Sequence, residues 1–132
     1  MIEVYPFDTV LFPFNWFMHM AHSMGDRLLR TARDRGMGVL AMKAFIERRW
    51  DEGEDKGPFP KPWCKPIDTD QEPGFGVAAM NYALSLGVNT LIPRGNIKGF
   101  SFAVEQIDAC DGKPDMALLK KKLEMVRGRE FF

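Results

Sequence analysis

The chain has 132 residues, of which 45% are hydrophobic and 27% charged, and this composition is that of one globular domain or part of one. It excludes wholesale disorder, and two distant cysteines exclude a disulfide framework. The 18 basic and 18 acidic side chains cancel to a net charge of +0, so we expect no nucleic-acid partner.

The N-terminal segment 9–25 has no Asp, Glu, Lys or Arg, yet it is not typical of a membrane span. A span needs about 20 apolar residues, and here Pro13 and Asn15 would leave polar groups in lipid. A secretory signal begins with basic residues, whereas this chain has Glu3 and Asp8 there. We therefore expect a cytoplasmic protein without a membrane partner.

The first predicted elements are a strand, a helix and a second strand. Residues 7–12 are nearly all apolar and Pro13 closes the run, which is typical of a short strand buried on both faces. A helix follows and Gly36 ends it. Its apolar stripe consists of Leu28, Leu29 and Ala32. Residues 37–44 are again apolar, apart from Lys43, and predict the second buried strand.

The segment 48–70 predicts a long loop. Charged residues come first, and four prolines follow, which remove backbone donors and favour an extended chain. Loops longer than about 12–15 residues are uncommon inside compact domains and are often functional.

The rest of the chain predicts three helices and a third strand. A helix begins between Thr69 and Pro73 and ends at Gly87, and residues 88–93 form the strand. The apolar face of that helix consists of Phe75, Ala78, Ala79, Tyr82, Ala83 and Leu86. Asn96 is suited to cap the next helix, with the face Phe100, Ala103, Val104 and Ile107. Pro114 opens a last helix over 114–127, with the face Met116, Leu119, Leu123 and Val126.

Alternating strands and helices predict an α/β fold with a parallel sheet. The three strands are apolar throughout, so both faces of the sheet require cover, but the chain has helices for only one face. The sequence is therefore typical of a part of something larger.

Three segments resemble the last three barrel strands of the aldo-keto reductases. They are Phe-Asp-Thr-Val-Leu-Phe-Pro-Phe-Asn-Trp at 7–16, Gly-Met-Gly-Val-Leu-Ala-Met-Lys at 36–43 and Gly-Val-Asn-Thr-Leu-Ile-Pro at 87–93. The stretch Lys-Pro-Trp-Cys-Lys-Pro at 61–66 and the Ala-Met-Lys ending resemble the branch called "predicted aldo/keto reductase". The resemblance extends from Phe7 to about Ile107.

The resemblance implies the C-terminal three βα units of a (β/α)8 TIM barrel, a fold of about 250 residues. It implies an NAD(P)H-dependent oxidoreductase acting on carbonyl substrates. The family's catalytic Asp, Tyr, Lys and His belong to the first half of the barrel, so no residue here takes a catalytic role and we expect the chain alone to be inactive. A missing N-terminal barrel half or self-association would complete it. The alternative is a non-catalytic, self-associating interaction module.

The resemblance also implies a place for NADP or NAD at the C-terminal ends of these strands. The nucleotide phosphate would lie at the turn Arg94, Gly95 and Asn96, where a helix begins. A helix N-terminus offers free N–H groups, Gly95 permits close approach and Arg94 adds positive charge. The alternative is an ordinary strand-to-helix turn with a solvated arginine.

Met42 and Lys43 end the second strand at the same edge, and we expect them beside the cofactor. Lys43 contacts cofactor or substrate, or else it extends to the surface as strand-end lysines do. The chain has Leu11 where many members have a carboxamide-binding Gln, and Met42 where many have an aromatic residue stacked on the nicotinamide. Phe100 lies near the place of the Arg that grips the 2′-phosphate, so the choice between NADP and NAD stays open.

Phe14 and Trp16 follow the first strand, where they line a substrate pocket or pack under a loop. His19 and His22 lie one helical turn apart, a spacing that can hold zinc, but no third ligand is evident nearby and we expect no metal site. We expect Cys64 to be structural, because no base partner for a nucleophile is evident.

Overall fold

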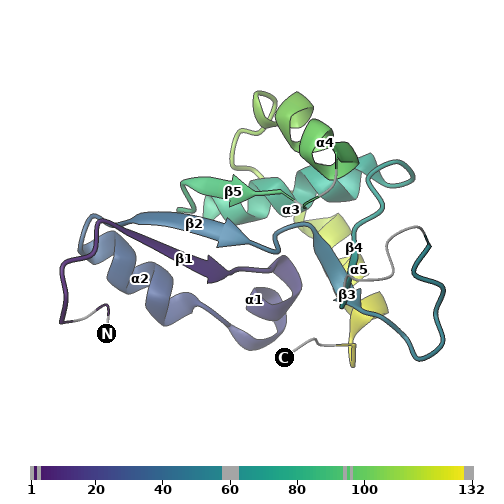
Figure 1. The fold of residues 1–132 in the computed structure, drawn as a ribbon, viewed down its shortest axis with the longest axis horizontal. Coiled ribbons are helices and arrows are strands. Elements are labelled where there is room, and N and C mark those ends of the chain that lie inside the picture. Colours follow the sequence, from purple (N-terminus) through teal and green to yellow (C-terminus); the bar gives the residue numbers. More distant parts are fainter. Residues whose placement is uncertain (1, 3, 58–62, 94, 96, 130–132) are drawn as a thin grey trace.

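Strands and helices are interspersed along the chain in the computed structural model, which describes residues 2, 4–57, 63–93, 95 and 97–129 (Figure 1). In chain order the elements are β1 (Thr9–Pro13), α1 (Trp16–His22), α2 (Asp26–Asp34), β2 (Gly38–Met42), β3 (Ile46–Arg49), β4 (Cys64–Pro66), α3 (Pro73–Ser85), β5 (Thr90–Ile92), α4 (Ile97–Ile107) and α5 (Met116–Val126).

A three-stranded parallel sheet in the order β1-β2-β5 confirms the predicted α/β class. Val10 lies opposite Val39, and Ala41 lies opposite Leu91. The strands fall within or beside the predicted apolar runs. Parallel neighbours require a crossover connection, and helices lie in both connections of this sheet.

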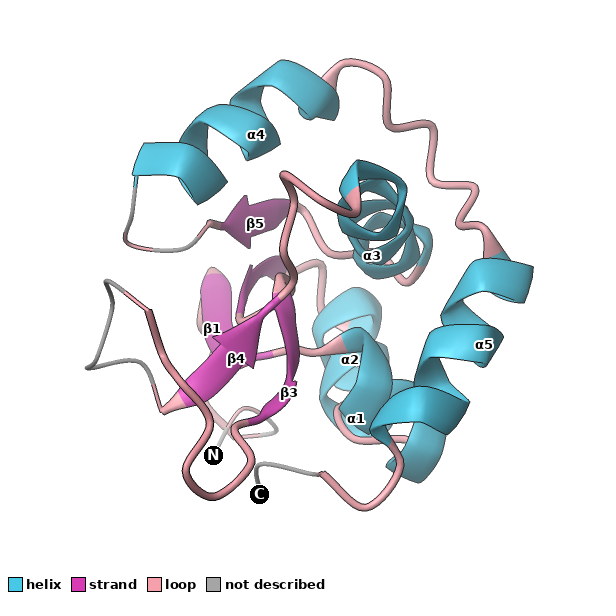
Figure 2. Ribbon diagram, turned by 90° about the vertical axis from the view of Figure 1, so that its right-hand side faces the viewer, coloured by secondary structure: helices cyan, strands magenta, loops and turns pink. Residues whose placement is uncertain are grey.

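Helices cover one face of the sheet. Viewed toward the strand ends, α1, α2, α3 and α5 lie on the same side of the three strands (Figure 2). Val39 and Ala41 of β2 share a buried core with Ala32 of α2 and Ala83 of α3. The small alanine side chains allow helix and sheet to approach closely.

The opposite face of the sheet is partly exposed, so the expectation that every strand is buried on both faces is wrong for this chain. Leu11 of β1 is 50% exposed and Ile92 of β5 is 36% exposed. Leu40 and Met42 of β2 lie between them and are half-buried. Leu11 is paired with Leu40, and Met42 with Ile92, so these four side chains form one apolar strip, called here the open face.

An antiparallel pair, β3 and β4, lies within and beside the segment predicted as a plain loop over 48–70. Ile46 lies opposite Pro66, and Arg49 lies opposite Cys64. Both strands are very short and mostly polar, so they carry no hydrophobic alternation that would have revealed them.

The helices α1, α4 and α5 also differ from expectation. α1 was not predicted, because its first turn is aromatic and has no periodic stripe. Of the face predicted for α4, only Ala103 is buried. α5 begins at Met116 with Asp115 as its N-cap, two residues after Pro114. Within the described ranges, no helix is long and apolar enough to cross a membrane.

Candidate functional site

A cavity of about 210 Å³ lies at the carboxyl ends of β2 and β5. Its lining consists of Met42, Lys43, Phe45, Ile46, Ile92 and Pro93. Lys43 is the one ionisable side chain in this lining. In folds with parallel sheets, ligands bind at the carboxyl ends of the strands, and we therefore take this cavity as the candidate site.

The backbone of Lys43 is held in a conformation that side chains rarely adopt. Its φ is +69°, in the left-handed region that favours glycine. The turn is closed by the N–H of Ile46, which donates to the carbonyl oxygen of Lys43 at 3.1 Å. Strain of this kind persists only where surrounding contacts impose it.

Asn15 supplies those contacts. Its side-chain Nδ2 donates to the carbonyl oxygens of Lys43 at 3.2 Å and of Ile46 at 2.6 Å. Its Oδ1 accepts from the backbone N–H groups of Phe17 and Met18 and so caps α1. Asn15 is only 2% exposed, so one buried carboxamide joins the end of β1 to the turn that carries Lys43.

Phe14 and Trp16 lie in the core, which corrects the expectation of a substrate pocket lined by them. Both have 0% exposure. The Trp16 indole packs edge-on against Phe75 at 5.1 Å between ring centres. Its Nε1 donates to the carbonyl oxygen of Ile46 at 3.1 Å, so Trp16 supports the Lys43 turn from below the surface.

The Lys43 side chain reaches the hairpin. Its ammonium lies 4.4 Å from the ring centre of Trp63, which is 66% exposed, and 3.9 Å from Sγ of Cys64. Burial raises the pKa of the Cys64 thiol, and the Lys43 charge offsets only part of this rise. The thiol is therefore protonated at neutral pH and does not neutralise the ammonium.

The predicted phosphate turn is described only at Gly95, since Arg94 and Asn96 lie outside the described residues. Apart from its two chain neighbours, no described residue comes within 4 Å of a Cβ placed at Gly95, so packing against the described residues does not require this glycine. α4 begins at Ile97, directly after this turn.

A larger cavity of about 460 Å³ lies between α4 and the segment before α3. Lys98 and Asp70 face each other there, with 2.6 Å between Nζ and Oδ2. The hydrogen bond to Asp70 raises the pKa of Lys98, which therefore stays charged. Sequence reasoning missed Lys98, although its place one residue into a helix after the Arg-Gly-Asn turn was a usable signal.

His19 is engaged by residues other than His22. Its Nδ1 lies 2.8 Å from the Tyr82 hydroxyl and its Nε2 lies 2.7 Å from Oδ1 of Asp26. Burial, with the charge of Asp26 adding to it, raises the pKa of Tyr82 to about 12. In the part of the chain that the structure describes, no three His, Cys, Asp or Glu side chains are grouped to hold a metal ion.

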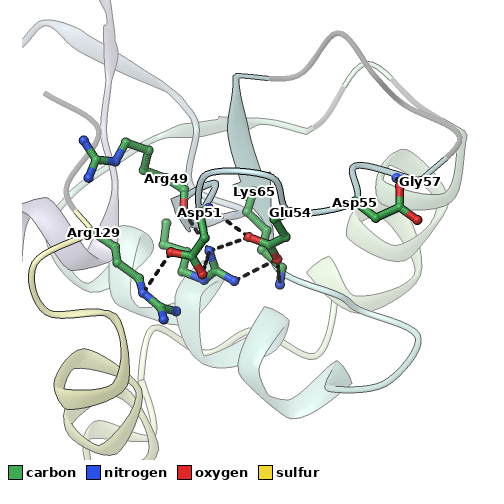
Figure 3. Close-up of polar contacts among 8 residues, drawn as sticks. Arg49, Asp51, Glu54, Asp55, Gly57, Lys65 and Arg129 are labelled. Atoms are coloured by element: carbon green, nitrogen blue, oxygen red, sulfur yellow. Dashed lines mark hydrogen bonds and ion pairs between the residues drawn. The ribbon is translucent and has the colours of Figure 1, made fainter.

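A cluster of charged side chains joins the two strands of the hairpin (Figure 3). Glu54 accepts two bonds from the Arg48 guanidinium, at 2.8 and 2.9 Å, and one from Lys65 at 2.7 Å. Arg129, three residues after the end of α5, joins the cluster, because it pairs with Asp51 at 3.3 Å. Its carbonyl oxygen accepts from the N–H of Arg49 at 2.9 Å.

Neutralising Glu54 should destabilise the protein in a pH-dependent way. The bonds from Arg48, with smaller help from Lys65, lower the pKa of Glu54 from 4.5 to about 2. A lowered pKa adds stability that is complete above pH 4.5 and is lost as the pH falls toward 2. We expect Glu54→Gln to lower the free energy of unfolding at pH 7 by about 1–2 kcal/mol.

Denaturant unfolding at pH 7 and near pH 2.5 measures this loss, and the difference between wild type and Glu54→Gln should shrink in acid. Glu52→Gln is the matched control, since Glu52 lies in the same turn, is exposed and should change stability little. A difference that stays equal at both pH values would contradict this role of Glu54.

Comparison with known proteins finds no match: no protein-family model, no curated protein and no solved structure resembles the chain significantly.

Proposed function

We propose that this chain is the C-terminal part of an aldo-keto-reductase-like (β/α)8 barrel that reduces carbonyl substrates with NADPH or NADH. The observation that carries the proposal is the open face, with helices on the other side of the sheet. A (β/α)8 barrel has this arrangement, because its helices lie outside and apolar side chains fill its interior. Leu11 and Ile92 would then face the barrel interior.

The edges of the sheet support the same proposal. Among the strands that the structure describes, β1 and β5 each pair with β2 alone, so each has one edge without a strand partner. Neighbours in the sheet also follow chain order, as barrel strands do. A missing N-terminal half would supply strands to both edges and close the barrel.

The residues at the strand ends fit a nicotinamide dinucleotide. The mostly apolar lining suits a flat ring against Met42, and the Lys43 end of the cavity is left for the substrate. Near the start of α4, the open space at Gly95 suits a phosphate group, and Arg94 is proposed to add a positive charge, whereas Lys98 nearby already pairs with Asp70. When bound, the dinucleotide supplies the hydride that reduces the carbonyl carbon.

In this proposal the chain binds and orients the dinucleotide, and the missing half of the barrel supplies the proton donor. Asn15 fixes the turn of Lys43, so the cofactor-side wall is preorganised before any ligand arrives. General acid catalysis contributes about 10²–10⁴-fold, which is why the chain alone should not reduce a carbonyl measurably.

Complementation tests the proposal. The chain is co-expressed with N-terminal half-barrels, strands one to five with their catalytic tyrosine, from aldo-keto reductases that carry the stretch at 61–66. We expect the purified complex, and neither half alone, to bind NADPH or NADH by fluorescence titration and to reduce an aldehyde. Arg94→Ala should weaken dinucleotide binding about ten- to a hundredfold. A stable complex that binds neither dinucleotide would contradict the proposal.

A second candidate, the non-catalytic self-associating module, is favoured by the outer surface of α4. Four apolar side chains lie along it at helical spacing, and they are Ile97 (77% exposed), Phe100 (53%), Val104 (56%) and Ile107 (41%). In this case the chain would form a defined homo-oligomer and would bind none of the N-terminal half-barrels used in the complementation experiment.

A further inference from the structure

We propose that the cavity at the ends of β2 and β5 binds a small apolar molecule that carries one carboxylate, with Lys43 as the counter-ion. This inference deepens the proposed function. It rests on that function for one point only, the identification of the bound molecule as the carbonyl substrate. The substrate would then be an oxo acid. The binding itself is argued from the cavity.

The residues that line the cavity indicate an apolar ligand. Met42, Phe45, Ile46, Ile92 and Pro93 offer apolar side chains, and Lys43 adds one positive charge. Pockets of this composition hold an apolar body by burial and orient it through a few polar groups. A single cation among apolar neighbours fits a ligand with one negative charge.

The charge of Lys43 has no carboxylate counter-ion in the part of the chain that the structure describes. Among the residues that the structure describes, its ammonium contacts the face of Trp63 and the sulfur of Cys64, and it forms no ion pair with a carboxylate. The thiol is protonated at neutral pH and brings no negative charge. A half-buried ammonium without a counter-ion favours an anion that supplies one.

The base of the side chain is rigid. Two hydrogen bonds from Asn15 and one from Trp16 hold the carbonyl oxygens of the Lys43 turn. A ligand therefore meets a cation whose backbone is already ordered, which reduces the entropy lost on binding.

The number of charges separates a carboxylate from a phosphate. A phosphate group carries close to two negative charges at neutral pH and needs more donors than one ammonium supplies. Of the other cations that the structure describes in this region, Lys65 and Lys98 line a different cavity. The site at β2 and β5 is therefore matched to a carboxylate.

Saturation-transfer NMR on the full 132-residue chain tests the proposal, since this method works for a monomer and for a larger assembly. The probes are 4-methylpentanoate, its uncharged amide 4-methylpentanamide, and inorganic phosphate as a competitor. We expect the wild-type chain to bind the acid about tenfold more tightly than the amide. Phosphate at equal concentration should not displace the acid.

Lys43→Met keeps the apolar stem and removes the charge, and Lys43→Gln is a second variant that serves if the first does not fold. In either one the acid and the amide should bind equally. Lys113→Met is the matched control, because Lys113 lies on the surface with its side chain 84% exposed and pairs with Asp111. This control should keep the preference for the acid.

Equal binding of acid and amide by the wild type, absence of binding by both, survival of the preference without Lys43, or displacement by phosphate would each overturn the proposal. No dinucleotide is present, so the result is separate from that of complementation. Acid binding in a chain that never restores reduction would refute the barrel function and leave the carboxylate site in place.

Discussion

Replacing Asn15 with Ala should lower the free energy of unfolding by about 2–4 kcal/mol. The change removes the cap of α1, which is worth about 1 kcal/mol. It also removes two buried donors to the carbonyl oxygens of Lys43 and Ile46. Denaturant unfolding measures the loss, with the slope of the transition compared to confirm that the folded state stays compact.

Two further variants separate the contributions of Asn15. Asn15→Ser keeps an oxygen for the cap and loses the donors, so it should cost less than Asn15→Ala. Asp115→Ala removes an exposed cap of the same type from α5 and should cost only about 1 kcal/mol. If Asn15→Ala costs no more than Asp115→Ala, the bonds to the Lys43 turn contribute nothing to stability.

The second large effect concerns association. We expect the wild-type chain to self-associate at tens of micromolar, because uncovered apolar faces and strand edges pair with other chains. Leu11→Lys places a charge on the open face, where Leu11 is 50% exposed. Removing one leucine from the contact should weaken association about tenfold or more.

Sedimentation velocity over a concentration series measures the effect of Leu11→Lys. Met125→Lys is the control, because Met125 is comparably exposed, at 60%, but lies on α5 away from the open face. A wild-type chain that stays monomeric throughout the series would count against the open face as a contact surface, and so would equal effects of the two lysines.

The strands and the longer helices could be predicted from the sequence because their signals are local. Residues 37–44 are apolar without a break until Lys43, and β2 lies within them. The hairpin could not be predicted, since Arg48 and Lys65 lie opposite each other in its register and share Glu54, and no repeat in the sequence records this pairing. α1 was missed because its start depends on the cap of Asn15 rather than on a stripe.

The candidate site was likewise predictable only where its signal is local in the sequence. Lys43 stood out as one charge in an apolar run, and the structure places it at the cavity. Its partners Asn15 and Trp63 lie far away in the sequence, and only the fold brings them to it. The sequence left Trp16 between lining a pocket and packing under a loop, because an exposed and a buried indole look alike in a sequence, and the structure shows it packed.

The hydrogen bond from the Arg49 N–H to the Arg129 carbonyl oxygen affects the order in which parts of the protein fold during synthesis. A ribosome releases the chain from its N-terminus, so β3 is available long before the residues that follow α5. The turn that holds Asp51 and Glu54 therefore lacks this contact until the residues that follow α5 have been made. Because the same hairpin places Trp63 against Lys43, we expect the candidate site to become ordered only after α5 has been made.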